Sequence, residues 1–233
     1  MKRIKFYLDF DGTITQNDVV DLILERFADK SWQKIEKKWQ EGKIGSRECL
    51  SRQLKLVKAT PEDLKNLCGE VAVDPHFLHF LQAAFKMDCQ VTITSDGFGF
   101  VIRNILERHL VGHEDLLKKI PVYSNEIQWT ASGVEAVFSS PDVCRHKCAN
   151  CKPEVIKNTA WPDDTVLFVG DGLSDRYAAH IASLTFAKGK LLQYCKDNEI
   201  AYEPYKDFSD VEKWFLKNYE SLKSQYAIQP RIV

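Results

Sequence analysis

The sequence has no long apolar run. A membrane-spanning helix needs about 20 predominantly apolar residues, and no stretch of the chain approaches that length. The N-terminal segment MKRIKFYLDF starts with basic residues, but its apolar run is too short for the hydrophobic region of a signal peptide and is interrupted by Asp9. We therefore expect no membrane association and no export. The seven cysteines are then expected to be reduced thiols in the cytoplasm.

The chain also lacks an excess of charge of either sign. Its 32 Lys and Arg residues nearly balance its 33 Asp and Glu residues, which leaves a formal net charge of -1. Proteins that bind nucleic acid or anionic lipid usually carry a basic surface, and no basic stripe interleaved with aromatic residues is present. The expected partner is therefore a small molecule bound at a local site, not a nucleic acid. The sequence leaves the oligomeric state open between a monomer and a homodimer.

Three short apolar runs predict buried parallel strands. They comprise Ile4 to Leu8, Val91 to Thr94 and Val166 to Val169, and each is followed by a polar cluster and then by a helical pattern. This repeated order of strand, loop and helix is typical of a doubly wound α/β fold with a parallel sheet. A hydrophobic content of 44% over 233 residues is sufficient for its core. Ligands of such sheets bind beyond the carboxyl ends of the strands.

Polar residues gather at those strand ends. DFDGT places Asp9 and Asp11 after the first run, TSDG follows the second, and GDGLSD places Asp171 and Asp175 after the third. A single Asp-Gly pair is usually an ordinary turn, but two such clusters after two apolar strands indicate a site. Four carboxylates brought together repel one another unless protons or a cation neutralise them. Their hard oxygens suit Mg²⁺, which is the predicted cofactor.

The segment between the first two strands is too long for a simple crossover, which needs only about a dozen residues. Its patterns are helical, with helix starts predicted near Ser31 and Thr60. We therefore predict a small helical bundle over residues 16–86, inserted after the first strand. The catalytic core would then comprise residues 1–15 and 87–233. A bundle above the strand ends can close the site against water.

Two further segments have patterns of their own. Ile127 to Phe138 predicts a small β-hairpin whose turn contains Ser132 and Gly133. The final segment has the sequence AIQPRIV, and the sequence leaves open whether it docks or stays disordered. No internal repeat or low-complexity tract is present.

The motifs resemble those of the haloacid dehalogenase-like hydrolases. DFDGT resembles the first motif of that family, the run ending in Ser95 the second, Lys152 the third and GDGLSD the fourth. Lys152 is preferred over Lys147 and Lys157 because Pro153 follows it at an expected helix start. A helical insertion between the first and second motifs is similar to the cap of the phosphoserine phosphatase-like subclass. The resemblance implies a Rossmann-like core with a cap, and a phosphatase that forms an aspartyl-phosphate.

The resemblance also implies a role for each matching residue. Asp9 would be the nucleophile that attacks phosphorus, and Asp11 the general acid and base. Adjacent strand residues face opposite ways, so a spacing of two directs both carboxylates at one phosphate. The implied Mg²⁺ ligands are Asp9, Asp11 through its backbone carbonyl, Asp171 and Asp175. The implied phosphate-binding groups are Ser95, Asp96, Gly97 and Lys152.

The predicted substrate depends on the insertion, where Asp18 and Gln53 are the expected substrate-binding residues. Phosphoserine phosphatases bind the substrate amine at the position of Asp18, but Gln53 stands where they use an arginine, and the second motif is SDG instead of SGG. With CxxCK before the fourth motif, the chain is more similar to the methionine-salvage phosphatases, which hydrolyse 2-hydroxy-3-keto-5-methylthiopentenyl-1-phosphate. Asp96 keeps phosphocholine or phosphoethanolamine as alternatives. A phosphotransferase using the same nucleophile is a further alternative.

A cysteine-rich loop precedes Lys152. The sequence PDVCRHKCANCK brings Cys144, Cys148 and Cys151 together, with His146 among them. Three thiolates and an imidazole are typical zinc ligands, but the spacing lacks the two separated pairs of a zinc ribbon. His146 also lies too close in sequence to the thiols to reach the same ion easily. We therefore favour a cysteine-rich, oxidisable loop beside the active site over a zinc site, and metal analysis would separate the two.

Overall fold

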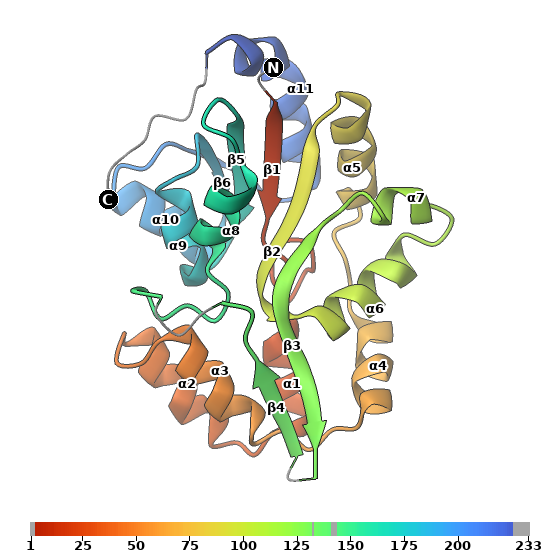
Figure 1. The fold of residues 1–233 in the computed structure, drawn as a ribbon, viewed down its shortest axis with the longest axis vertical. Helices are drawn as coiled ribbons and strands as arrows, with labels where there is room; N and C mark the ends of the chain where they lie inside the picture. The colour runs from red at the N-terminus through yellow and green to blue at the C-terminus, as the bar shows by residue number, and fades with distance from the viewer. Residues whose placement is uncertain (1–2, 132, 141–143, 226–233) are drawn as a thin grey trace.

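The computed structural model describes residues 3–131, 133–140 and 144–225, and one seven-stranded sheet forms its centre (Figure 1). The strand order is β4-β3-β2-β1-β5-β6-β7, and every neighbouring pair is parallel except β3 and β4. The predicted doubly wound α/β fold is confirmed. The strands are β1 (Ile4–Leu8), β2 (Gln90–Phe98), β3 (Val122–Thr130), β4 (Gly133–Val137), β5 (Thr165–Gly170), β6 (Leu184–Ala187) and β7 (Tyr202–Pro204).

Helices connect the parallel strands and cover both faces of the sheet (Figure 1). Five of them, α1 to α5, fall between β1 and β2. The helices are α1 (Val19–Phe27), α2 (Trp32–Gln40), α3 (Ser46–Leu54), α4 (Pro61–Glu70), α5 (Phe77–Lys86), α6 (Gly99–His109), α7 (Glu114–Leu117), α8 (Lys152–Thr159), the 3₁₀ helix η1 (Leu173–Asp175), α9 (Arg176–Ala179), α10 (Gly189–Asp197) and α11 (Phe208–Gln225).

Alternate residues of β1 face the two layers of the core. Phe6 packs between Phe80 of α5 and Phe215 of α11, with ring centroids 5.0 and 5.1 Å away. Tyr7 points to the other face, into a cluster built with residues of α8, α9 and α10. Successive strand side chains face opposite sides of a sheet, so this central strand is covered on both faces and all five of its residues are buried. That burial explains why the strand is apolar except for Lys5, whose buried ammonium pairs with Asp164 (3.2 Å).

Strand β2 is longer than the sequence indicates. The apolar pattern predicts Val91 to Thr94, whereas the strand continues to Phe98 and includes the SDG of the second motif. Its pairing with β3 shifts register between Thr94 and Phe98. An irregularity of this kind bends a strand and redirects its side chains. The second motif therefore lies within a bent strand end and not in a loop beyond it.

The two predicted helix starts of the insertion differ in how they are capped. Thr60 precedes α4 in a capping box, because its hydroxyl accepts a hydrogen bond from Asp63 N (3.1 Å) while Asp63 Oδ2 accepts one from Thr60 N (2.8 Å). Ser31 precedes α2 but makes no capping bond. Its backbone is already helical, whereas a capping residue is normally extended. The N–H of Ser31 instead donates to Asp29 Oδ1 (2.9 Å).

The helices of the insertion contact different parts of the molecule. Helix α5 packs against β2 and α11, and α4 packs against α6. Helices α2 and α3 pack together, and α3 also contacts β4, at the end of the molecule away from α5 (Figure 1). The division into a cap of residues 16–86 and a core of residues 1–15 and 87–233 stays a prediction. The contacts of α5 favour a cap that ends before this helix.

The predicted hairpin forms the edge of the sheet beside α3. Strands β3 and β4 pair antiparallel up to Thr130 and Gly133, and Trp129 Nε1 donates to Ala59 O of the insertion (3.1 Å). Ser132 of the predicted turn lies outside the described residues, and so does the terminal segment 227–233. Within the described part of the chain, no helix has the length and apolar character needed to cross a membrane.

Candidate active site

Asp9 and Asp11 lie directly after β1. The N–H of Asp9 donates to Val169 O of β5 (2.9 Å), so the residue continues the sheet pairing while its side chain is buried. The turn that follows requires Gly12, whose φ is +70° and where an added Cβ would lie 2.7 Å from Asp171 Oδ2. The glycine thus lets the backbone of the first motif pass directly against the fourth.

Lys152, the first residue of α8, lies among carboxylates. Its side chain is 1% exposed, and Nζ lies 2.7 Å from Asp9 Oδ1 and 2.5 Å from Asp175 Oδ1. Burial acts to lower the pKa of Lys152, but the charges of Asp175 and Asp9 outweigh it and raise the pKa above its ordinary value. Lys147 and Lys157, the alternatives considered from the sequence, are exposed. Of these three lysines, the fold brings Lys152 to the first motif.

The carboxylates of the fourth motif complete the group around Asp9. Asp175 Oδ2 accepts hydrogen bonds from the backbone N–H groups of Asp171 (3.1 Å) and Gly172 (3.0 Å). Thr13 Oγ1 donates to Asp171 Oδ1 (2.9 Å). One carboxylate oxygen from each of Asp9, Asp171 and Asp175 lies within 4.8 Å of the others, and we call these three residues the carboxylate cluster. Its hard oxygen donors fit Mg²⁺.

Burial and mutual repulsion raise the pKa values of the site carboxyls. The pKa of Asp9 lies well above its ordinary range, first because of burial and then because of the nearby Asp175. The same two causes raise the pKa of Asp171 to about 6. Burial, followed by the charge of Asp18, raises the pKa of Asp11 to about 7. These shifts indicate a site that favours the binding of further positive charge.

The bent end of β2 faces Asp11. Ser95 Oγ donates to Asp11 Oδ2 (3.0 Å) and accepts a hydrogen bond from Gly97 N (2.8 Å). The other oxygen, Asp11 Oδ1, accepts from Val19 N at the start of α1 (3.2 Å). Gly97 is required at this point because an added Cβ would lie 2.5 Å from Asp11 Oδ2. Ser95 and Gly97, both predicted to bind phosphate, thus lie beside the second aspartate.

Asp96 is fixed by Asn150, a residue that the sequence analysis missed. Asn150 N donates to Asp96 Oδ1 (3.1 Å), and its buried Nδ2 donates to Ser95 O (3.0 Å) and to Tyr123 O (2.8 Å). These bonds join the cysteine-rich loop to β2 and β3. The available sequence signal was the position of Asn150, two residues before Lys152.

A cavity of about 430 Å³ lies beside the aspartates of the first and fourth motifs. Asp9, Asp11 and Asp171 line its core side, together with Asp96 and Gly97 of β2. The opposite wall comes from the insertion, with residues of α1, α2 and α3. A space of this size suits a small ligand. The insertion therefore bounds the region in which a substrate would lie.

The two predicted substrate-binding residues reach this cavity and also have protein partners. Asp18 Oδ1 accepts a hydrogen bond from Asp21 N (3.0 Å), which caps α1. Gln53 is buried, and its Nε2 donates to Glu36 Oε2 (3.0 Å). Burial, followed by repulsion from Asp18, raises the pKa of Asp21 to about 7. Glu36 and Trp39 line the same wall, but nothing in the charged sequence of α2 distinguished them.

The cysteine-rich loop folds back on itself beside α8. One ligand atom from each of Cys144, His146, Cys148 and Cys151 lies within 4.8 Å of the others, and we call these four residues the cysteine cluster. The argument that His146 lies too close in sequence to join the thiols is therefore wrong. The chain reverses at Lys147, whose φ is +54°, and this brings the imidazole and the three free thiols together.

Comparison with known proteins gives consistent results for sequence and fold. The model of the family described as "Putative Phosphatase" matches residues 4–184. A protein of Bacillus mycoides (strain KBAB4) named 2-hydroxy-3-keto-5-methylthiopentenyl-1-phosphate phosphatase is 28% identical over 212 residues, which covers 89% of this chain and 94% of that protein. A protein of Bacillus pumilus (strain SAFR-032) with the same name is 28% identical over 221 residues, 92% of each chain.

A solved structure extends the similarity to the fold. It is described as a phospho-aspartyl intermediate analogue of phosphoserine phosphatase, and it superposes with a TM-score of 0.67 at 20% sequence identity. The match covers 92% of this chain and 99% of that one. The two proteins therefore share the fold over most of both chains.

Proposed function

The chain belongs to the family described as "Putative Phosphatase", and from this membership we propose that it is a Mg²⁺-dependent phosphatase that forms an aspartyl-phosphate on Asp9. The protein is a phosphoric monoester hydrolase, as its family and its named relatives are. One observation supports the specific mechanism. Two strands and a helix bring four side chains together, namely Asp9 and Asp11 after β1, Ser95 of β2 and Lys152 of α8. The two aspartates line a cavity of small-molecule size.

Asp9 is the proposed nucleophile. Its carboxylate oxygen attacks phosphorus, the bond from phosphorus to the ester oxygen breaks, and the aspartyl-phosphate forms. Lys152 Nζ, 2.7 Å from Asp9 Oδ1, favours the ionised carboxylate and offsets the negative charge of the arriving phosphate. The Ser95 hydroxyl and the N–H of Gly97 are suited to donate hydrogen bonds to phosphoryl oxygens.

Asp11 is the proposed general acid and base. In its protonated form it gives a proton to the departing alkoxide, and as a carboxylate it then takes a proton from the water that hydrolyses the aspartyl-phosphate. Burial and the charge of Asp18 raise the pKa of Asp11 to about 7, which suits both roles near neutral pH. The hydrogen bonds from Ser95 and from Val19 N fix the orientation of its two oxygens.

The carboxylate cluster is the proposed Mg²⁺ site, with the backbone carbonyl of Asp11 as a further ligand. When bound, the ion offsets the repulsion between an anionic nucleophile and an anionic phosphate. The chain orients the ligand oxygens through its own hydrogen bonds. Thr13 holds Asp171, and the N–H groups of Asp171 and Gly172 hold Asp175.

The first candidate substrate is 2-hydroxy-3-keto-5-methylthiopentenyl-1-phosphate or a similar uncharged, oxygenated chain bearing one phosphate. Two relatives that match nearly the whole chain carry that name. The cavity also has an apolar part, formed by Val20, Cys49 and Leu50, which suits a thioether group. This candidate requires no charged partner beyond the phosphate-binding groups.

A second candidate is a phosphomonoester with a cationic group, such as phosphocholine or phosphoethanolamine. Asp18, Asp21 and Glu36 line one wall of the cavity, and Trp39 lies on the same wall. Carboxylates and an aromatic ring are the groups that recognise ammonium ions. The same charges disfavour phosphoserine, because its carboxylate would be repelled.

A comparison of these substrates under one condition tests the proposal. Phosphate release would be measured with Mg²⁺ for the keto phosphate, phosphocholine, phosphoethanolamine, phosphoserine and an aryl phosphate. We expect kcat/KM to be highest for the keto phosphate. Added acceptor alcohols should not reduce the phosphate released per substrate consumed, as they would for a phosphotransferase. The absence of hydrolysis with every substrate would contradict the proposal.

The variant Glu36→Gln separates the two candidate substrates. Removing this charge should lower kcat/KM for the cationic substrates by about tenfold, which corresponds to about 1.4 kcal/mol, and leave the keto phosphate nearly unaffected. Glu25→Gln on the exposed side of α1 is the matched control, because it makes the same change away from the cavity. Equal effects of both variants would show that the acidic wall does not select the substrate.

We also propose a cytoplasmic location. All seven cysteines are free thiols in the structure, as expected in a reducing compartment. Fractionation with an antibody to the chain would test this part of the proposal directly.

A further inference from the structure

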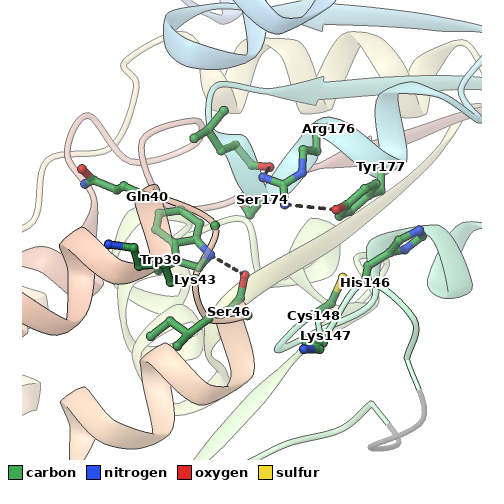
Figure 2. Close-up of a pocket in the computed structure, with 14 residues that line it drawn as sticks. Trp39, Gln40, Lys43, Ser46, His146, Lys147, Cys148, Ser174, Arg176 and Tyr177 are labelled. Atoms are coloured by element: carbon green, nitrogen blue, oxygen red, sulfur yellow. Dashed lines mark hydrogen bonds between the residues drawn. The ribbon is translucent and has the colours of Figure 1, made fainter.

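The cysteine cluster is separate from the proposed active site. Among the described residues that line the large cavity, none belongs to the cluster. His146 and Cys148 instead line a second, smaller space, which the loop forms with the end of α2 and with Arg176 and Tyr177 of α9 (Figure 2). Cys148 and Cys151 are buried. The cluster therefore needs an explanation other than contact with the substrate.

His146 has an unsatisfied ring nitrogen. Its Nδ1 is buried and has no hydrogen-bond partner among the described residues. The ring is held in place by stacking on Tyr177, with ring centroids 3.8 Å apart and planes 11° apart. Its Nε2 accepts a hydrogen bond from Nε of Arg145 (3.1 Å), whose side chain is exposed. A fixed, buried nitrogen without a partner, next to three thiols, indicates a missing ligand.

We propose that Cys144, His146, Cys148 and Cys151 form a structural zinc site. Three sulfurs and one imidazole are a complete donor set for tetrahedral Zn²⁺. A Zn–S distance of about 2.3 Å places tetrahedral ligand atoms about 3.8 Å apart, so atoms that already lie within 4.8 Å of one another need close by only about 1 Å. With four protein ligands no position stays open for substrate, which defines the site as structural.

The donor atoms separate this site from the carboxylate cluster. Thiolates are soft ligands that favour zinc, whereas carboxylate oxygens are hard ligands that favour Mg²⁺. Arg145 and Arg176 lie close enough to His146 to act on its charge. Their positive charges would offset the net negative charge of Zn²⁺ with three thiolates. The two sites can therefore hold different metals in the same protein.

The position of the loop gives the zinc site a role. Lys147 O accepts a hydrogen bond from Arg47 N at the start of α3 (3.3 Å), and Gly45 lies so close that an added Cβ would be 2.4 Å from Lys147 Cβ. At the other end of the loop, Cys151 directly precedes Lys152. A metal that fixes the loop would therefore fix both its contact with the insertion and the entry of Lys152 into the active site.

A disulfide is the competing explanation for the thiols. A bond between Cys148 and Cys151 would use two of the four residues and would explain neither the third thiol nor the unpartnered nitrogen of His146. The convergence of all four ligand atoms favours a metal. The sequence spacing alone did not reveal this convergence, because it depends on the chain reversal at Lys147.

Metal analysis of the full chain, purified without a metal-affinity tag, tests the inference. We expect stoichiometric zinc in the wild-type protein, loss of the zinc in Cys148→Ser and a reduced content in His146→Ala. Cys89→Ser is the matched control, because it removes a buried thiol outside the cluster and should keep the zinc. Asp9→Asn should also keep the zinc while it loses activity, which distinguishes this inference from the proposed function.

Cobalt substitution keeps the test decisive if the cysteine variants do not fold. Wild-type protein reconstituted with Co²⁺ should show the thiolate-to-cobalt charge-transfer band and the visible bands of a tetrahedral site. Substoichiometric zinc in the wild-type protein together with the absence of these bands would overturn the inference. So would a disulfide within the cluster, found by mass spectrometry in protein prepared without oxidant.

Discussion

The carboxylate cluster and the cysteine cluster lie on the two sides of Lys152, yet they are built in opposite ways. The carboxylates come from two strand ends far apart in the sequence, and a buried lysine lies between them. The cysteine cluster comes from one loop of eight residues. The first group contains carboxylates whose mutual repulsion a bound cation can relieve, whereas the second is a complete ligand set for one metal ion. The carboxylate cluster is therefore suited to catalysis, whereas the cysteine cluster is suited to stabilising a loop.

The substitution Asp9→Asn should give the largest effect, because it removes the nucleophile from one cluster and leaves the other intact. We expect kcat/KM for an aryl phosphate to fall by about 10³-fold or more. This fall is measured as phosphate release in the presence of Mg²⁺, and circular dichroism checks that the variant is folded. Asp163→Asn is the matched control because Asp163 is exposed. Near wild-type turnover in Asp9→Asn would remove the basis for the mechanism.

Omission of Mg²⁺ should have the next largest effect. Because repulsion within the carboxylate cluster opposes the binding of phosphate, we expect activity to fall by about 10²-fold or more without the ion. Added Mg²⁺ should restore it, whereas zinc held by the cysteine cluster should remain throughout, as metal analysis of the same samples would show. Full activity in Mg²⁺-free buffer would contradict the assignment of hard and soft sites.

Replacement of Lys152 by Met tests the residue that lies between the clusters. It leaves Asp9 and Asp175 buried without their partner, and breaking a buried pair in this way costs about 3–5 kcal/mol. We expect a lower free energy of unfolding and little activity, with partial recovery of stability in Mg²⁺. Lys157→Met, on the exposed side of α8, is the control. Chemical denaturation with and without Mg²⁺ measures both; unchanged stability would refute this role of the lysine.

The smallest effect is expected from Asp171→Asn, measured as stability in the absence of Mg²⁺. The folded-state pKa of Asp171 is raised from 3.8 to about 6 by burial and Asp175. This carboxyl therefore destabilises the fold as pH rises from about 4 through about 6. Above that range the variant should be more stable than the wild type by up to about 3 kcal/mol, at about 1.4 kcal/mol per pKa unit, and below pH 4 the gain should disappear.

Asp164→Asn provides the control of opposite sign. Burial acts to raise the pKa of Asp164, but the N–H of Trp161 and the ammonium of Lys5 outweigh it and lower the pKa. Its charge therefore stabilises the fold at neutral pH, and that contribution is lost as pH falls below about 4. Denaturation curves from pH 4 to pH 8 would compare the two variants. The same sign of change in both would show that repulsion in the carboxylate cluster does not reduce stability.

The sequence predicts much of the fold because the central strands β1, β2 and β5 are short, mostly apolar and mostly buried. Ile4–Leu8 is recovered without change as β1. The end of β2 is not, because Ser95 to Gly97 are polar and their place in the strand depends on pairing with β3. The sequence also does not predict the chain reversal at Lys147, because lysine does not itself favour a positive φ.

The residues of the active site also differ in whether the sequence alone identifies them. Asp9 and Asp11 are identified by their own spacing after a strand, and Lys152 by the proline that follows it. Asn150, Glu36 and Trp39 are not, because their importance comes from what lies opposite them in space. Helix α2 has an apolar face with Trp32, Ile35 and Trp39, but such a face alone indicates packing and not a ligand. Its contribution to the cavity wall is therefore seen only in the folded structure.

The doubly wound sheet, the order of the motifs and the residue types of the chemistry could be read from the sequence, because buried strands and their polar ends leave local patterns. The folded structure was needed to show that Asn150 meets Asp96, that His146 meets three thiols, and that carboxylates of the insertion face those of the core. These are contacts between segments that the chain brings together by crossing the sheet and reversing in loops. Their energies depend on distance and burial, which no spacing along the sequence records.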